Sequence, residues 1–317
     1  MEMVKWACLN LQQNQIGNRR LWLSRTLGVL VALLLTMSVY SSMCLGTTSA
    51  TDADDGRSSP PVTEIPFQLY NDNLIVVKGS IGSITRLNLI LDTGTTHTAL
   101  SKLIISRLNL RGNTESLQTF TGATQTQSFV LPHIELGAIS AEDVRVVVQD
   151  LGFLKQNFGI SVAGIVGIDV LSRCNFSIDY RKGKIVFGSI PPTKHTVPFV
   201  TRTPLLTVKT MIEREEVRLL LDSGTPGLLV FRNRLKTPLA PLPSVPPALM
   251  ATTAGATPAH SFRAAVALGK ESLGVHTLQI ADVDFARKSG FDGLMGFAAL
   301  GFRRVSFDFQ NGIFGWE

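Results

Sequence analysis

The stretch that decides the fold is Leu87-Asn88-Leu89-Ile90-Leu91-Asp92-Thr93-Gly94-Thr95, an apolar run that ends at an aspartate followed by a glycine between two hydroxyl residues. The chain of 317 residues repeats this pattern as Val217-Arg218-Leu219-Leu220-Leu221-Asp222-Ser223-Gly224-Thr225. Such an acidic tetrapeptide arises by chance in roughly one chain in fifty of this length, so two copies are much rarer. Each apolar run is typical of a buried strand that delivers its aspartate to a turn.

The segments that follow the two aspartates also correspond, at a nearly constant spacing. Asp92 and Asp222 lie 130 residues apart. The pair Thr121-Gly122-Ala123-Thr124 and Ala254-Gly255-Ala256-Thr257 is 133 residues apart, and the pair Gly164-Ile165-Val166-Gly167 and Gly293-Leu294-Met295-Gly296 is 129 residues apart. Two domain-sized copies, in contrast to the short repeats of a solenoid, predict a pseudo-twofold pair of lobes.

These repeated features resemble those of the retropepsin-like aspartic peptidases, in the bacterial form that fuses two lobes into one chain. In that family each lobe supplies an Asp-Thr/Ser-Gly loop, a glycine-containing hairpin flap, and two hydrophobic residues with a glycine that brace the loop from behind. The resemblance covers about residues 65 to 317. It implies an all-β, bilobal fold in which each lobe is a closed β-barrel with one or two short helices.

The resemblance also assigns roles to the repeated residues, with Asp92 and Asp222 as the catalytic pair. The residues that would support the two loops are Thr93, Gly94, Thr95, Ser223, Gly224 and Thr225. Those that would brace the loops are Gly164, Ile165, Val166, Gly167, Gly293, Leu294, Met295 and Gly296. The flaps would be Thr121, Gly122, Ala123, Ala254, Gly255 and Ala256, with hairpins of no catalytic role as the alternative.

The chemistry of this family needs two carboxyl groups rather than one. Held about 3 Å apart, two carboxyl groups cannot both ionise, so the pair keeps one proton and titrates as a unit. The ionised member can then activate a water molecule while the protonated member hydrogen-bonds the peptide carbonyl that the water attacks. The resemblance implies that Thr95 and Thr225 donate to the outer carboxylate oxygens, which would lower the pKa values of the pair and give an acidic optimum.

The chain divides where its composition changes. We expect a basic stretch with a signal peptide or signal anchor at residues 1–50, a disordered tether at 51–62, a first lobe at 63–190, a linker at 191–203 and a second lobe at 204–317. The stretch from Thr47 to Pro61 is rich in Thr, Ser, Asp and Pro, and it cannot bury enough apolar surface to offset the entropy of ordering. At the start of the first lobe, Thr63 to Asp72 is either a first strand or a removable pro-segment.

The N-terminal segment predicts export. Arg19, Arg20 and Arg25 precede an uncharged, largely apolar stretch from Thr26 to Gly46. Both a cleaved signal peptide and a retained membrane anchor fit this pattern. Because positive charges remain in the cytoplasm, both alternatives place the lobes outside it, in the periplasm or cell envelope or as a secreted protein.

Charge and motifs exclude several other functions. The formal charge is +6, and it falls to +3 when the four bases and one acid of residues 1–50 are set aside, which predicts no nucleic-acid partner. No His-Glu-x-x-His or Cys-x-x-Cys motif is present, so we expect neither a metal nor a cofactor. The sequence predicts a monomeric aspartic endopeptidase that binds polypeptides in extended form. The alternative is a non-catalytic peptide-binding or envelope-associated protein with the same fold.

Overall fold

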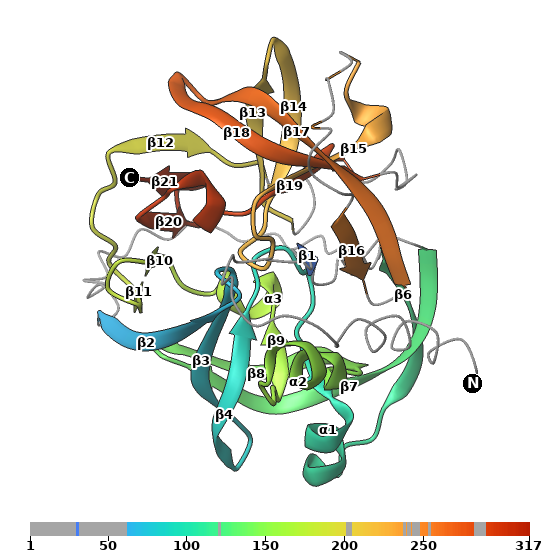
Figure 1. Cartoon of the computed structure of the whole chain (residues 1–317). Helices are drawn as coiled ribbons and strands as arrows, with labels where there is room; N and C mark the ends of the chain where they lie inside the picture. The colour runs from blue at the N-terminus through green and yellow to red at the C-terminus, as the bar shows by residue number, and fades with distance from the viewer. Residues whose placement is uncertain are drawn as a thin grey trace, which may run out of the picture.

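The structure is a computed structural model that describes residues 30–31, 62–119, 122–200, 205–236, 239, 242, 248–252, 255–281 and 290–317. Figure 1 shows two β-rich lobes, the first in blue to green below and the second mostly in orange above, with a shared sheet at the left. The predicted all-β, bilobal fold is confirmed.

The first lobe contains a closed barrel of six strands. In order around the barrel these are β3 (Leu74–Ile81), β4 (Ile84–Leu91), β9 (Gly164–Val166), β5 (Ala99–Ser101), β8 (Ile139–Gln149) and β7 (Gly122–Leu136). The barrel closes where β7 pairs with β3, with Ile134 opposite Ile81. An additional strand, β6 (Asn113–Thr119), forms a long hairpin with β7 that extends beyond the barrel.

The second lobe repeats this barrel strand for strand. In the same order its strands are β13 (Thr207–Ile212), β14 (Glu215–Leu221), β19 (Gly293–Met295), β15 (Leu228–Phe231), β18 (Glu271–Ala281) and β17 (Gly255–Leu268). Its hairpin partner strand is β16 (Ala248–Thr252), and the short β1 (Leu30–Val31) pairs in parallel with β16. The shared strand order is the structural counterpart of the sequence duplication.

A sheet built from both lobes joins the two barrels. Its strands, in order, are β2 (Thr63–Tyr70), β11 (Lys184–Phe187), β10 (Phe176–Asp179), β20 (Arg304–Asp308), β21 (Ile313–Trp316) and β12 (His195–Pro198). At its centre Phe176 lies opposite Phe307, and their rings stack with centroids 4.8 Å apart. The segment for which a strand or a pro-segment was expected therefore supplies the strand β2, and β12 lies inside the expected linker.

The helices are short and lie between strands. They are α1 (Lys102–Leu108), α2 (Gly152–Phe158), α3 (Ile168–Leu171), η2 (Arg232–Arg234) and η3 (Ala298–Leu300). The helix α1 buries Ile104 and Ile105 against the barrel and ends at Asn109, whose left-handed backbone (φ 49°) stops further helical bonding. Since α3 and η3 follow the two brace segments, the duplication extends to these turns.

The predicted tether apart from Val62, and the predicted signal or anchor apart from Leu30 and Val31, lie outside the described residues. Within the described ranges, no helix is long and apolar enough to cross a membrane.

Candidate active site

The strands β4 and β14 carry the two aspartates into the space between the lobes. The last three residues of each strand are fully buried: Leu89, Ile90, Leu91, Leu219, Leu220 and Leu221. Burial on both faces explains why these runs are continuously apolar rather than alternating. The backbone N–H of Asp92 donates to the Val166 carbonyl, and that of Asp222 to the Met295 carbonyl, each at 3.0 Å.

The brace segments, Gly164–Gly167 and Gly293–Gly296, hold the loops from behind as strands β9 and β19. Their apolar side chains, Ile165, Val166, Leu294 and Met295, are fully buried. A Cβ at Gly164 would lie 2.7 Å from the Ala99 carbonyl oxygen, and one at Gly296 would overlap the Thr225 carbonyl. The glycines are therefore required by close backbone approach rather than by unusual backbone angles.

The two aspartate loops are joined by reciprocal hydrogen bonds across the lobes. The Thr93 N–H donates to Ser223 Oγ and the Ser223 N–H donates to Thr93 Oγ1, both at 3.0 Å. Each hydroxyl in turn donates to the opposite strand end, Thr93 Oγ1 to the Leu221 carbonyl at 2.9 Å and Ser223 Oγ to the Leu91 carbonyl at 3.1 Å. Both hydroxyls are buried and fully bonded, so the two loops are fixed relative to one another.

Each carboxyl group lies against the glycine of the opposite loop. Asp92 is 0% exposed and Asp222 is 1% exposed. The N–H of Gly94 donates to Asp92 Oδ1 and that of Gly224 to Asp222 Oδ1, both at 2.8 Å. A Cβ at Gly94 would lie 2.5 Å from Asp222 Cγ, and one at Gly224 would lie 3.3 Å from Asp92 Oδ2. The structure thus brings the two aspartates together as a pair.

The outer hydroxyl residues of the two loops behave differently, and here one sequence prediction is wrong. Thr225 Oγ1 donates to Asp222 Oδ2 at 2.6 Å, as the resemblance implied. Thr95 Oγ1 instead donates to the carbonyl of His97 at 3.2 Å, because the backbone after Thr95 turns back toward its hydroxyl. Asp92 Oδ2 therefore has no hydrogen-bond donor among the described residues.

The electrostatics of the pair follow from this difference. Burial raises the pKa of Asp92 well above its usual range, and the neighbouring Asp222 carboxylate raises it further. Burial also raises the pKa of Asp222, but the hydrogen bonds from Thr225 and Gly224 oppose that rise. The expectation of lowered pKa values is therefore wrong in direction, because desolvation outweighs the donors. Both shifts favour a pair that shares a proton, and Asp222 has a hydroxyl donor that Asp92 lacks among the described residues.

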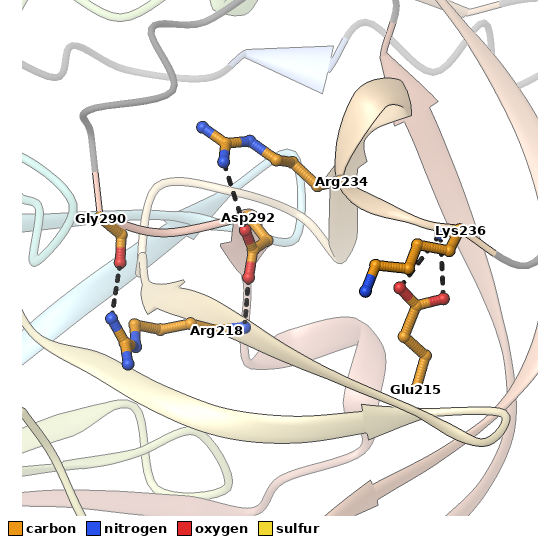
Figure 2. Close-up of polar contacts among 6 residues, drawn as sticks. All are labelled: Glu215, Arg218, Arg234, Lys236, Gly290 and Asp292. Atoms are coloured by element: carbon orange, nitrogen blue, oxygen red, sulfur yellow. Dashed lines mark hydrogen bonds and ion pairs between the residues drawn. The ribbon is translucent and has the colours of Figure 1, made fainter.

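In the second lobe a charged cluster fixes the segment that leads into β19. Figure 2 shows Arg218 reaching from β14 to Gly290, where Arg218 Nη1 donates to the carbonyl at 3.2 Å. The Arg218 N–H donates to Asp292 Oδ2 at 2.8 Å, and the Asp292 N–H returns a bond to the Arg218 carbonyl at 2.7 Å. Arg234 lies 3.9 Å from the same carboxylate. The cluster therefore fixes the residues that immediately precede the second brace segment.

The first lobe makes the same backbone connection without an arginine–aspartate cluster. Asn88 occupies the position of Arg218 in the repeat, and its Nδ2 donates to the Ser161 carbonyl at 3.0 Å. The Ala163 N–H donates to the Asn88 carbonyl at 2.8 Å, the counterpart of the bond made by Asp292. Asn88 Oδ1 also accepts a hydrogen bond from Lys78 Nζ at 2.5 Å. The backbone pattern is thus shared between the lobes, whereas the arginine–aspartate pairing belongs to the second lobe.

Both expected flaps are β-hairpins. In the first, β6 and β7 pair so that Gly122 lies opposite Thr119 and Ala123 opposite Gln118. In the second, β16 and β17 pair so that Gly255 lies opposite Thr252. The expected tip residues Thr121 and Ala254 lie outside the described residues. Closure of these hairpins over a substrate stays a prediction.

Two polar residues near the loops were missed by the sequence reasoning. Asp169 accepts hydrogen bonds from the N–H of Thr98 at 2.8 Å and from its hydroxyl at 2.9 Å, which ties α3 to the chain after Asp92. Asn73 donates from Nδ2 to the carbonyl of Gly224 in the opposite lobe. The repeat has Ala298 at the position of Asp169. Because neither Asp169 nor Asn73 recurs in the second half, a comparison of the two halves does not identify them.

The chain is similar to aspartic proteases in the sequence of its first lobe and in its fold. Residues 77–170 match a family model described as aspartyl protease. No curated protein sequence matches the chain. Among solved structures, the crystal structure of an aspartic proteinase from Irpex lacteus aligns with a TM-score of 0.51 and 14% identity, covering 81% of this chain and 97% of that one. This structural likeness concerns the fold.

Proposed function

We propose that this chain, which is identified as a retropepsin-like aspartyl protease by its first lobe and has an aspartic proteinase fold, is a single-chain aspartic endopeptidase. It would hydrolyse peptide bonds with a water molecule activated between Asp92 and Asp222. The observation that carries the proposal is the set of reciprocal hydrogen bonds between Thr93 and Ser223, which hold the two buried carboxyl groups against one another. An arrangement with a buried charge is costly for stability, so its presence favours a catalytic use.

The asymmetry of the pair assigns a role to each carboxyl group. Asp222, whose ionised form is stabilised by Thr225 and Gly224, would act as the base that removes a proton from the attacking water. Asp92, whose pKa is raised by burial and by the neighbouring Asp222, would hold the shared proton and donate a hydrogen bond to the carbonyl oxygen as negative charge develops there. The proton taken by Asp222 then passes to the departing amine. No covalent bond to the protein forms at any step.

The substrate class follows from the surroundings of the pair. The pair lies where the lobes meet, and each lobe presents a long hairpin, β6–β7 or β16–β17. Hairpin edges offer backbone N–H and C=O groups that an extended peptide can pair with. We therefore propose a polypeptide bound in extended form between the hairpins, with cleavage inside the chain.

One chain supplies both loops, so a monomer is sufficient for activity. We also propose that the protein acts outside the cytoplasm, on the basis of the arginines and apolar run near its N-terminus. Fractionation of cells that express the full chain tests this placement. Recovery in the cytoplasmic fraction would contradict it.

The central experiment is cleavage of a mixed peptide library by the purified protein from acidic to neutral pH. Wild-type protein should cleave, and Asp92→Asn and Asp222→Asn should each lower the rate by about 100-fold or more, since each removes one half of the acid–base pair. A folded monomeric wild-type protein that binds peptides without cleaving them would favour the non-catalytic alternative. Unchanged cleavage in either variant would contradict the shared pair.

A further inference from the structure

A tight turn places Asn73 at the boundary between the lobes. The turn joins β2 to β3, and its two central residues, Asn71 and Asp72, have positive φ angles of 50° and 60°. The Asn73 N–H closes it by donating to the Tyr70 carbonyl at 3.2 Å. Two positive φ angles define the hairpin turn that matches the twist of its strands, and Asn and Asp tolerate them well. The position of Asn73 is therefore set by local backbone geometry.

The side chain of Asn73 reaches across to the catalytic loop of the other lobe. Asn73 is 2% exposed, and its Nδ2 donates to the carbonyl of Gly224. Asn71 Nδ2 donates to Asn73 Oδ1 at 3.4 Å, which orients the amide so that its nitrogen faces Gly224. A buried amide that lost this acceptor would be left without compensation for desolvation. The contact is therefore strongly favoured once the lobes are assembled.

The carbonyl that Asn73 holds belongs to the turn that supplies both donors to Asp222. The N–H of Gly224 donates to Asp222 Oδ1, and the hydroxyl of Thr225 donates to Asp222 Oδ2. The peptide between Gly224 and Thr225 begins at the same carbonyl. Because glycine restricts its own backbone less than other residues do, an outside contact has a large part in fixing this peptide.

We propose that Asn73 is a positioning residue of the catalytic pair, through which the first lobe orients the hydrogen-bond donors that stabilise the charged form of Asp222. This inference rests on the proposed peptidase function and adds a residue to it. Asn73 does not touch the substrate in this account. It acts on Asp222 only through Gly224 and Thr225. The charged or titratable group that faces Asp222 among the described residues is Asp92.

The chain offers a matched control in Asn175. This asparagine also connects the lobes, because its Nδ2 donates to Asp308 Oδ1 at 3.0 Å and its Oδ1 accepts from the Phe309 N–H at 2.8 Å. It lies next to the central strand of the shared sheet and makes no hydrogen bond to either aspartate loop. Loss of Asn175 should therefore weaken the lobe interface without changing the surroundings of Asp222.

The test compares Asn73→Leu, Asn73→Ala and Asn175→Ala with the wild-type full chain. Leucine nearly preserves the volume of Asn73 while it removes the donor, so it separates lost packing from a lost hydrogen bond. Both Asn73 variants should lower kcat about tenfold, the effect of about one hydrogen bond, with little change in KM. The acid limb of their kcat–pH profiles should move to higher pH, because Asp222 loses part of the stabilisation of its charged form. Asn175→Ala should lower Tm and leave the pH profile unchanged.

A carboxyl-carbon NMR titration of Asp222 gives a second readout that does not depend on cleavage. A higher pKa of Asp222 in Asn73→Leu than in the wild type would support the positioning role, even if the wild-type protein cleaved no peptide and the proposed function failed. Asn73 variants that match Asn175→Ala, with a lower Tm, an unchanged pH profile and an unchanged Asp222 titration, would overturn the inference.

Discussion

The two aspartate loops have the same backbone and different surroundings. Both end a buried strand, both donate a glycine N–H to their own aspartate, and both exchange hydrogen bonds with each other through Thr93 and Ser223. Beyond this shared frame, the second loop adds the Thr225 hydroxyl and the Asn73 amide, whereas the hydroxyl of Thr95 turns away. The shared backbone therefore fixes where the two carboxyl groups lie, and the side chains that differ between the lobes give Asp222 donors that Asp92 lacks among the residues described.

The same contrast continues behind the loops. In the first lobe, Asn88 fixes the residues just before the brace segment and accepts a hydrogen bond from Lys78. In the second lobe, the corresponding residues are fixed by Arg218, Asp292 and Arg234. The first lobe instead anchors the far side of its loop through Asp169 and Thr98. Each lobe therefore stabilises one common backbone geometry by its own polar contacts.

The largest effect is expected at the brace glycines, where the two lobes differ in how closely the neighbouring backbone approaches the glycine. A Cβ at Gly296 would overlap the Thr225 carbonyl, whereas one at Gly167 would lie 2.9 Å from the Thr95 carbonyl oxygen. Gly296→Ala should therefore lower the free energy of unfolding by about 3 kcal/mol or more and abolish cleavage, and Gly167→Ala should cost about 1–3 kcal/mol. Urea unfolding measures both. Gly152→Ala is the control, because its Cβ would meet only the flexible end of Asp150; equal losses at all three sites would refute the explanation.

Removal of either hydroxyl from the reciprocal hydrogen bonds, that of Thr93 or that of Ser223, should lower the free energy of unfolding by a similar amount. Thr93→Val and Ser223→Ala each remove a hydroxyl that donates once and accepts once, and each leaves buried partners unsatisfied. We expect a loss of about 1–3 kcal/mol in each variant. The double variant should lose less than the sum because the two hydroxyls act in one network. Fully additive losses in a double-mutant cycle would show that the two loops are independent.

Removal of the hydroxyls of Thr225 and Thr95 should affect the pH dependence of kcat differently. Thr225 donates to the charged form of Asp222, so Thr225→Val should raise the pKa of Asp222 and move the acid limb of kcat upward by about one pH unit. Thr95→Val should leave that limb in place, since its hydroxyl serves the His97 carbonyl. A kcat–pH profile of both variants tests this difference. Equal shifts would restore the symmetric pair that the sequence predicted.

A smaller effect is expected on stability. The folded-state pKa of Asp92 is raised above its unfolded value, so its contribution to stability is complete below the unfolded pKa and is lost as pH rises through the folded pKa. Asp92→Asn removes this loss, and it should raise Tm relative to wild type at neutral and higher pH but not at acidic pH. Thermal unfolding as a function of pH measures the gain. A variant that is less stable at neutral pH than at acidic pH, relative to wild type, would contradict the assignment.

The sequence predicted the features that both halves share. The buried runs before Asp92 and Asp222, the brace glycines and the hairpins recur at a constant spacing, so comparing the halves identified them without any coordinates. The lobe architecture followed from the same repeat. These features could be predicted because the same backbone requirement recurs in both halves, such as the close approach of Gly167 to Thr95 and of Gly296 to Thr225.

The remaining features depend on tertiary contacts that no repeat records. The hydroxyl of Thr95 follows the same motif as that of Thr225, and only the folded backbone shows that it bonds to His97. Asn73 lies far along the chain from Gly224, and in sequence it is merely a polar residue before an apolar run. The pKa values were predicted in the wrong direction because donors can be counted in a motif, whereas burial cannot.

The most direct test of the central claim is a complementation assay with the two inactive variants. If both loops of one chain form one pair, Asp92→Asn and Asp222→Asn should each be inactive as purified proteins, and a mixture of the two should remain inactive at every ratio. Wild-type protein at the same total concentration gives the reference rate. Cleavage restored on mixing would show that the working pair forms between chains, and it would contradict the single-chain dyad.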